Sequence, residues 1–442
     1  MIRKLTIIFL LFHHALPAQN PFTDSLIAFY KKKVEQYLDK DKSLSGYYSV
    51  ERSGIKIFPS LEKKLKDSAE FVLPWDDLQN FKVALRFDTN AYKSVYCHNI
   101  YTRDHGKRIT VPKVRIGNIP IDRIYTDTAA YSLKGKRIAI DPGHVGGSEE
   151  DARMERKMVK PELDSIQQTT DDTILIEGNL TMQTALLLKK RLEEKGAIVM
   201  LTRTREGQNA FGYSFETWMK RDLKKAVDEA LRHHEISEAE KKKLLDPKTK
   251  REYIFQHFFV QEDLKKRAEK INAFRPDLTI VIHYNADEKN KHWIKTGTKD
   301  FNMAFIPGSF MEKEMDTRRN RFEFLRLLVS DDIDESKRAA SSLINAFVKK
   351  LKVPAAKDSD ATYLSESCIN TGVNGVYCRN LALTRFVHGP VVYGETLYQD
   401  NLLEFKMLSN QEMKLNGVQT SIRVQQVADA YYEGINNFFS TR

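Results

Sequence analysis

The stretch Ile-Ala-Ile-Asp-Pro-Gly-His at residues 138–144 joins an apolar strand pattern to a histidine at its end. Three later segments repeat the arrangement, each an apolar run that ends in a residue able to bind a metal or move a proton. They are Ile174–Glu177, Ile280–His283 and Val391–Glu395. In open α/β sheets, ligand-binding side chains gather at the carboxyl ends of the strands. The four segments therefore predict one shared site built from distant parts of the chain.

The residues around these segments indicate the fold class. Apolar residues at helical spacing follow Glu177, Gly196 is suited to end that helix, and an apolar strand pattern returns at 198–201. Continuous apolar strands that alternate with helices are typical of a sheet covered on both faces. We therefore expect an α/β fold with a central, twisted, mostly parallel sheet and helices on both faces.

His144, His283 and Glu177 offer two imidazoles and one carboxylate, which is a common ligand set for catalytic zinc. Such a shell leaves one position open for water, and zinc lowers the pKa of that water and polarises a carbonyl. A further acid must then take the proton of the water and pass it to the leaving group. Glu395 suits that role. Spacing alone does not establish the site, because an isolated histidine is usually structural and Glu177 would also suit a helix N-terminus.

The short sequence motifs around the four residues, taken together and in their order along the chain, resemble those of the zinc-dependent N-acetylmuramoyl-L-alanine amidases of bacterial cell-wall turnover. The resemblance covers residues 134–410. It implies that Zn²⁺ is held by His144, Glu177 and His283, and that Glu395 is the catalytic acid/base. It also implies hydrolysis of the peptidoglycan amide between N-acetylmuramic acid and L-alanine. Val145 stands where the family usually repeats glycine, and Val281 replaces a common serine.

Two other functions remain open at this stage. One is a catalytically idle protein that binds the wall or regulates another enzyme. The other is a different zinc peptidase that acts on wall peptides. The presence of Glu395 argues against the first, because an idle protein would be free to lose its acid/base.

The chain divides into three expected parts: a signal peptide at 1–18, a small α+β accessory region of unknown role at 19–130, and the catalytic domain at 131–442. A helix is expected at 22–41, and short strands within 45–125 include 82–87 and 114–116. Surface insertions are expected near 148–172, 207–260 and 300–335. In the family, a helical insertion can cover the zinc until a partner releases it. We hypothesise such a lid, opened by an activator protein, at 207–260 or in the acid-rich segment Glu149-Glu150-Asp151 beside His144.

The N-terminus predicts export to the periplasm or the medium, since Arg3 and Lys4 precede the apolar run at 5–12. No segment approaches twenty apolar residues, so no stable membrane anchor is expected. The net charge of +11 suits an anionic envelope. Nucleic acid is not expected as a partner, because the basic residues alternate with acids as on solvated helix faces. Cys368 and Cys378 are the cysteines able to pair.

Several other residues have open roles. Arg203 is assigned equally to substrate binding or to capping its strand, and Asp141 either orients His144 or serves in the turn at 141–143. Glu149, Glu150 and Asp151 are rival ligands, although consecutive acids in a polar loop are usually solvated. The remaining histidines have no partner motif and are expected to be structural or exposed, His388 being the least certain of them.

Overall fold

The structure is a computed structural model that describes residues 21–87, 103–104, 107–108, 132–161, 173–233, 235–290, 294–415 and 417–441. The expected signal peptide, the expected strand at 114–116 and Cys97 lie outside the described residues. No helix among these residues is long and apolar enough to cross a membrane.

A seven-stranded sheet forms the centre of the molecule, in the order β12-β13-β11-β14-β10-β6-β9. β14, β10, β6 and β9 are parallel neighbours, β11 runs antiparallel to β14, and β13 is parallel to β11 and antiparallel to β12. The strands are β6 (Arg137–Pro142), β9 (Ile198–Leu201), β10 (Leu278–Asn285), β11 (Met303–Ile306), β12 (Cys368–Val373), β13 (Val376–Arg379) and β14 (Val391–Tyr398).

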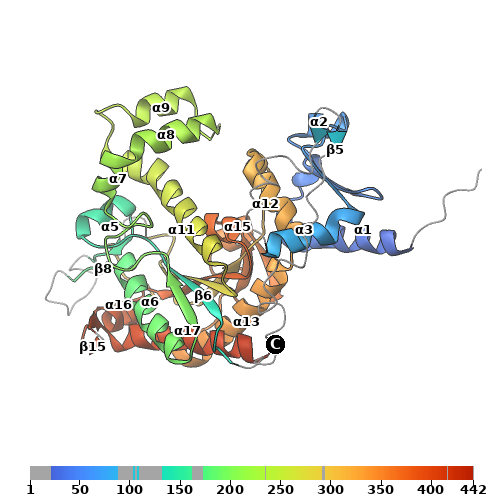
Figure 1. The fold of residues 1–442 in the computed structure, drawn as a ribbon. Coiled ribbons are helices and arrows are strands. Elements are labelled where there is room, and N and C mark those ends of the chain that lie inside the picture. Colours follow the sequence, from blue (N-terminus) through green and yellow to red (C-terminus); the bar gives the residue numbers. More distant parts are fainter. Residues whose placement is uncertain are drawn as a thin grey trace, which may run out of the picture.

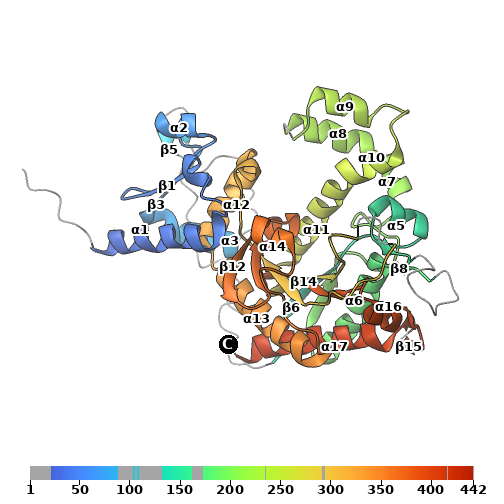
Figure 2. The same ribbon diagram turned by 180° about the vertical axis from the view of Figure 1, so that it is seen from behind.

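Helices cover both faces of this sheet, as Figures 1 and 2 show. One face packs on α6 (Glu177–Glu194), α13 (Asp332–Leu351) and α17 (Ile422–Ser440), and its strands contribute Ile138, Ile140 and Ile280 to the main core. The other face packs on α11 (Val260–Phe274) and α15 (Ala382–Phe386) through Ala139 and Val281. Alternate residues of each strand are thus buried on opposite faces. The expectation of an α/β fold with a mostly parallel sheet is confirmed.

The N-terminal residues form a small α+β unit that docks on the sheet domain. It comprises α1 (Pro21–Lys33), the antiparallel strands β1 (Tyr48–Glu51), β2 (Gly54–Ile57) and β3 (Phe71–Pro74), and α3 (Trp75–Phe87). The strand expected at 82–87 is wrong, because these residues are helical. Leu78, Phe81 and Leu85 lie at helical spacing and pack against the core, which outweighs the β-favouring run.

The unit docks on α12 (Arg318–Val329), nearly all of which is buried. Arg321 Nε donates to Glu70 Oε2 (2.6 Å), and the rings of Phe71 and Phe322 meet edge to face. The surface insertion expected at 300–335 is therefore wrong: this segment supplies β11 to the middle of the sheet and the helix that carries the N-terminal unit. The charged residues of this segment suggested an exposed surface, but Arg318 and Arg321 form ion pairs with Glu70 of the N-terminal unit.

Residues 207–260 form an arm of short helices that stands apart from the sheet (Figure 1). The helices are α7 (Phe215–Arg221), α8 (Leu223–Arg232), α9 (Glu238–Leu244) and α10 (Arg251–Ile254). Ser237 caps α9 as expected, accepting a hydrogen bond from the Glu240 N–H. A π-helical turn at Phe255–Phe259 joins α10 directly to α11, so one helical rod runs from the arm to the sheet.

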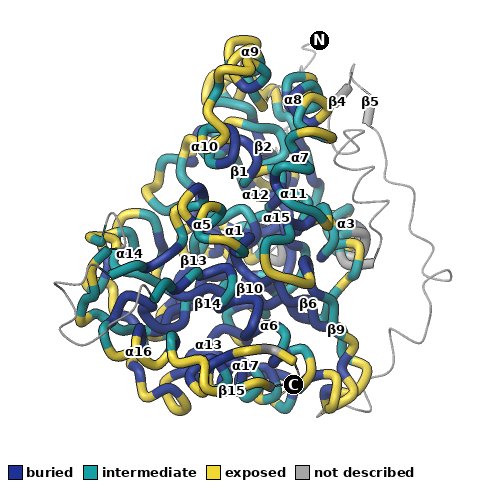
Figure 3. Tube along the Cα trace, turned by 90° about the vertical axis from the view of Figure 1, so that its left-hand side faces the viewer, coloured by how far each residue is buried: buried dark blue, intermediate teal, exposed yellow. Residues whose placement is uncertain are grey.

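The arm has a hydrophobic core of its own, which extends to the loop after β6. Trp218 and Phe259 are fully buried in it, together with Phe215, and Val145 and Met154 complete it from the catalytic domain. Within the arm, Figure 3 shows exposed residues around α9, at its far end. The valine at 145 thus packs against the arm, which accounts for an apolar side chain at that position.

The remaining described elements complete the chain. They are α2 (Leu61–Leu65), β4 (Arg103–Asp104), β5 (Lys107–Arg108), α5 (Glu149–Glu155), β7 (Met158–Val159), β8 (Leu175–Ile176), α14 (Thr362–Ser367), α16 (Leu402–Ser409), β15 (Met413–Leu415) and β16 (Val418–Thr420), with single turns at Val34–Leu38, Leu44–Gly46 and Glu312–Met315. Cys368 and Cys378 are free thiols in separate cores, so they do not pair.

Candidate metal centre

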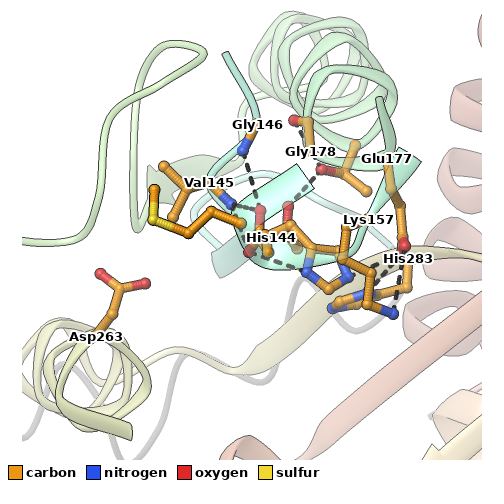
Figure 4. Close-up of polar contacts among 12 residues, drawn as sticks. His144, Val145, Gly146, Lys157, Glu177, Gly178, Asp263 and His283 are labelled. Carbon is orange, nitrogen blue, oxygen red and sulfur yellow. Dashed lines mark hydrogen bonds and ion pairs between the residues drawn. The ribbon is translucent and has the colours of Figure 1, made fainter. Parts of the chain in front are cut away.

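His144, Glu177 and His283 converge at the carboxyl end of the parallel strands (Figure 4). His144 Nε2 lies 3.1 Å from Glu177 Oε1, and His283 Nδ1 lies 2.9 Å from the same oxygen. The two imidazole rings stand nearly perpendicular, with centroids 4.6 Å apart. One ligand atom from each residue fits within 4.8 Å of the others. The structure therefore brings together the three residues predicted as ligands.

Glycine at position 143 lets the loop after β6 pass close to His283. Its N–H donates to the Ile282 carbonyl (2.9 Å), which ties the loop to β10. A Cβ atom on Gly143 would lie 2.3 Å from His283 Nε2, closer than any side chain permits. The next residue, His144, has φ 60°, a left-handed backbone that a non-glycine residue rarely adopts. Such strain persists where surrounding contacts hold it, often at functional sites.

Two buried arginines, Arg203 and Arg267, donate hydrogen bonds to the backbone carbonyls of this loop. Arg203 Nη2 donates to the carbonyls of Gly143 (2.8 Å) and Gly178 (2.7 Å), joining the loop to the first turn of α6. Arg267 donates to the His144 carbonyl (2.8 Å) and pairs with Asp263 and Asp141. The strained loop is thus fixed by charged hydrogen bonds to its backbone, which are stronger than neutral ones.

Glu155, at the end of α5, supplies a contact that sequence reasoning missed. Its Oε1 accepts hydrogen bonds from His144 Nδ1 (3.1 Å) and from the Val145 N–H (3.1 Å). A carboxylate on the outer nitrogen of a ligating histidine fixes the ring and its tautomer. The sequence carried little signal for this role, because Glu155 lies in a polar insertion with no motif around it. Asp141, the residue considered for this task, hydrogen-bonds Thr202 and pairs with Arg267 instead.

The buried atoms of this cluster fit a cation. Neither His144 Nε2 nor Glu177 Oε2 has a hydrogen-bond partner among the described residues, although both are buried. Glu177 Oε2 lies 3.7 Å from the Lys157 ammonium nitrogen. Buried polar atoms without partners are costly, and each such group calls for an explanation. Two imidazoles and a carboxylate that leave acceptor atoms unpaired are a donor set suited to zinc.

Burial and mutual charge shift the pKa values of the cluster. Burial alone would raise the pKa of Glu177, but the nearby His144 and Lys157 charges hold it well below its usual range. Burial, reinforced by His144, lowers the pKa of His283 to about 4. Glu177 is thus an anion and His283 a neutral imidazole near pH 7, which are the forms that bind a metal. Burial would lower the pKa of His144, but the Glu177 and Glu155 carboxylates raise it, so metal binding there displaces a proton.

Glu395 lies on β14 directly beside His283 on β10. Residues in register on parallel neighbours point to the same face, so the carboxyl group shares the face of the sheet that carries the histidine. Burial and the charge of Glu177 raise its pKa to about 7. Tyr393, two residues earlier on the same face, stacks on the His283 ring with centroids 4.3 Å apart. A carboxyl group that titrates near neutrality is suited to proton transfer.

Other candidates lie outside the cluster. Arg203 is buried on backbone carbonyls, which gives it a structural role in place of substrate binding. The rival acids serve α5: Asp151 forms its capping box with Ser148, and Glu149 pairs with Arg153. His388 contacts Glu323 (3.5 Å) near the opposite end of β14, and His233 is exposed at the end of α8.

A family of known proteins matches most of this chain. A family model described as N-acetylmuramoyl-L-alanine amidase matches residues 138–437, well over half of the chain. No curated protein matches the sequence.

Solved structures are also similar. The CwlD amidase from Clostridioides difficile, in complex with the GerS lipoprotein, is 17% identical and covers 70% of this chain and 100% of its own, with a TM-score of 0.37. The amidase Ami1 from Mycobacterium smegmatis is 16% identical over 70% of this chain and 100% of its own, with a TM-score of 0.38. The amidase AmiC2 of Nostoc punctiforme is 13% identical, and the match covers 69% of this chain and 98% of AmiC2, with a TM-score of 0.34.

Proposed function

The chain belongs to the N-acetylmuramoyl-L-alanine amidase family, and from that premise we propose that it is a zinc enzyme whose metal is held by His144, Glu177 and His283, with Glu395 as the general acid/base. As a member of this family it hydrolyses the peptidoglycan amide between N-acetylmuramic acid and L-alanine. The metal and the four residue roles are the parts that we propose.

One observation carries the zinc assignment: His144 Nε2 and Glu177 Oε2 are buried without hydrogen-bond partners among the described residues, and His283 Nδ1 lies 2.9 Å from the other oxygen of the same carboxylate. Burying polar atoms without hydrogen bonds lowers the stability of the folded protein, and a bound cation would offset this cost. Bound zinc supplies Lewis acidity at such a site, polarising the scissile carbonyl and making water acidic enough to attack near neutral pH.

The chain's own residues supply orientation and proton transfer. Glu155 fixes the His144 ring through Nδ1, and Tyr393 supports the His283 ring by stacking. Glu395 takes a proton from the attacking water and returns it to the nitrogen of the leaving L-alanine, so that the amine departs uncharged. Its raised pKa suits both halves of this task, since the acid and the base forms must each be available in turn.

The test compares two variants for metal content and turnover. Glu395→Gln keeps the size of the side chain and removes its proton transfer, so it is expected to retain zinc and lose activity by at least about a hundredfold. His144→Ala is expected to lose both. Zinc is measured by mass spectrometry of the purified protein, and turnover by release of stem peptides from purified sacculi. Full turnover by the glutamine variant, or zinc retained by the alanine variant at wild-type affinity, contradicts the assignment.

Product analysis separates this function from that of a zinc peptidase acting on wall peptides. The amidase frees whole stem peptides from the glycan, whereas a peptidase frees amino acids or dipeptides. Mass spectrometry of the digest distinguishes them. Release of amino acids alone contradicts the proposed bond.

We propose that the protein is exported, because its substrate lies outside the cytoplasm and residues 3–12 have the pattern of an export signal. Fractionation of cells that express the full chain tests this, with N-terminal sequencing of the mature protein. Cytoplasmic retention of an uncleaved chain contradicts it.

We also keep the hypothesis that a partner protein acts through the arm at 207–260. Val145 and Met154 belong to the arm's core, and each lies next to a residue of the metal site, His144 or Glu155. Movement of the arm would therefore disturb the site directly. A deletion of 212–256 that folds and keeps both wild-type activity and wild-type zinc affinity contradicts a regulatory role for the arm.

A further inference from the structure

Arg379, at the end of β13, lies on the same face of the sheet as Glu395. Phe305 on β11 is in register with Tyr393 on β14 and with Tyr377 on β13. Glu395 lies two residues after Tyr393, and Arg379 lies two residues after Tyr377. Side chains two residues apart on a strand share a face. A single face therefore carries His283, Glu395 and, two strands further on, Arg379, whose backbone lies four residues along β13 from the level of Glu395.

Two aromatic rings hold the Arg379 guanidinium. Its central carbon lies 4.8 Å from the Phe305 ring centroid and 4.6 Å from that of Tyr363 on α14. Tyr363 is fixed in turn, because its hydroxyl accepts a hydrogen bond from Asn285 Nδ2 (3.2 Å), two residues after His283. A guanidinium stacked on aromatic rings keeps its N–H edges free for a ligand and loses little further freedom on binding.

The guanidinium has no ion-pair or hydrogen-bond partner within the part of the chain that the structure describes. Comparable buried arginines are paired: Arg267 meets Asp141 and Asp263, and Arg423 meets Glu404. Arg379 is partly buried, so its charge loses some hydration without gaining a carboxylate in return. An orientated, unpaired guanidinium on the face of a proposed active site is suited to an anionic group of the substrate.

We propose that Arg379 binds a carboxylate of the peptide leaving group and so sets the enzyme's preference for anionic stem peptides. The inference rests on the proposed function, since it assumes that the peptide lies on the Glu395 face of the sheet. Stem peptides carry free carboxylates beyond the scissile amide, and in some walls these are amidated. A fork-shaped guanidinium binds a carboxylate through two parallel hydrogen bonds and cannot do so with a neutral amide.

The test uses two soluble muramoyl-peptide substrates, identical except that the peptide carboxylates of one are free and those of the other are amidated. The wild-type enzyme is expected to have a kcat/KM on the order of ten- to a hundredfold higher for the free carboxylates, as expected for a charge-assisted contact. Arg379→Gln is expected to lose this preference through KM on the anionic substrate alone. Arg379→Lys keeps the charge without the fork and is expected to retain part of it.

Controls separate recognition from folding and from general charge. Arg232→Gln removes one exposed positive charge from the arm and is expected to behave as wild type. Zinc content and unfolding midpoints of all variants show whether the site is intact. Equal losses on both substrates in Arg379→Gln, or a wild-type enzyme indifferent to amidation, overturns the proposal while leaving the amidase function in place. A wild-type enzyme that cleaves neither substrate nor sacculi overturns the proposed function itself.

Discussion

Replacing Glu155 with glutamine tests whether the insertion at 148–172 tunes the metal site. The carboxylate accepts from His144 Nδ1 at 3.1 Å and holds the Val145 N–H through both oxygens, at 3.1 and 3.2 Å. Glutamine keeps one acceptor oxygen and the same length, but it carries no charge. Hydrogen bonds to charged groups contribute about 1.5–3 kcal/mol and neutral ones about 0.5–1.5 kcal/mol, so the exchange loses about 1–1.5 kcal/mol.

A change of about 1.4 kcal/mol is a factor of ten in an equilibrium constant. The zinc Kd of Glu155→Gln is therefore expected to rise about tenfold, at the lower end of the usual effect of such outer contacts. Competition with a chromophoric chelator measures the Kd, and urea unfolding of the metal-free protein checks the fold. Glu149→Gln is the matched control, because Glu149 lies on the same helix and contacts Arg153 at the surface. A zinc Kd within twofold of wild type for Glu155→Gln would refute the reasoning.

Two further predictions concern a close approach and a buried acid. Gly143→Ala is expected to abolish zinc binding, because its Cβ would lie 2.3 Å from His283 Nε2. Gly297→Ala is the control and should bind zinc normally, because its Cβ would meet open space. Equal zinc contents of the two variants would contradict this prediction. The pKa of Asp300 is raised to about 7 by burial and the charge of Glu404, against about 3.9 in the unfolded chain. The folded protein thus holds an extra proton between these values, and stability falls as pH rises from about 4 to about 7. Asp300→Asn should therefore be more stable than wild type by urea unfolding at pH 8 and lose that advantage at pH 4; an advantage that is the same at both would exclude this cause.

The sequence predicted the parallel strands and the three converging residues because each lies in a short word with its own physical signal. Apolar runs set the strands that end near His144 and His283, and a short apolar run precedes Glu177 at the start of α6, so each polar residue lies at the shared edge. The roles of these residues at zinc remain predictions until metal is measured.

What the sequence did not predict depends on partners distant in the chain. Residues 300–335 carry many charges, yet Arg321 pairs with Glu70, and residues 302–310 and 321–330 are buried. Glu155 gains its role only because α5 returns to the loop after β6. Residues 82–87 favour a strand locally, and tertiary packing of Phe81 and Leu85 selects a helix instead.

The helical rod from Arg251 to Phe274 belongs to both the arm and the sheet domain. At about 1.5 Å per residue it is about 36 Å long. Its arm end carries Phe255 and Phe259, and its sheet end carries Arg267, which grips the carbonyl of His144. If a partner that binds the arm changes the affinity for zinc by some factor, then zinc changes the affinity for that partner by the same factor, because coupled binding equilibria are reciprocal. Zinc occupancy would then be readable from the outer end of the arm, far from the metal.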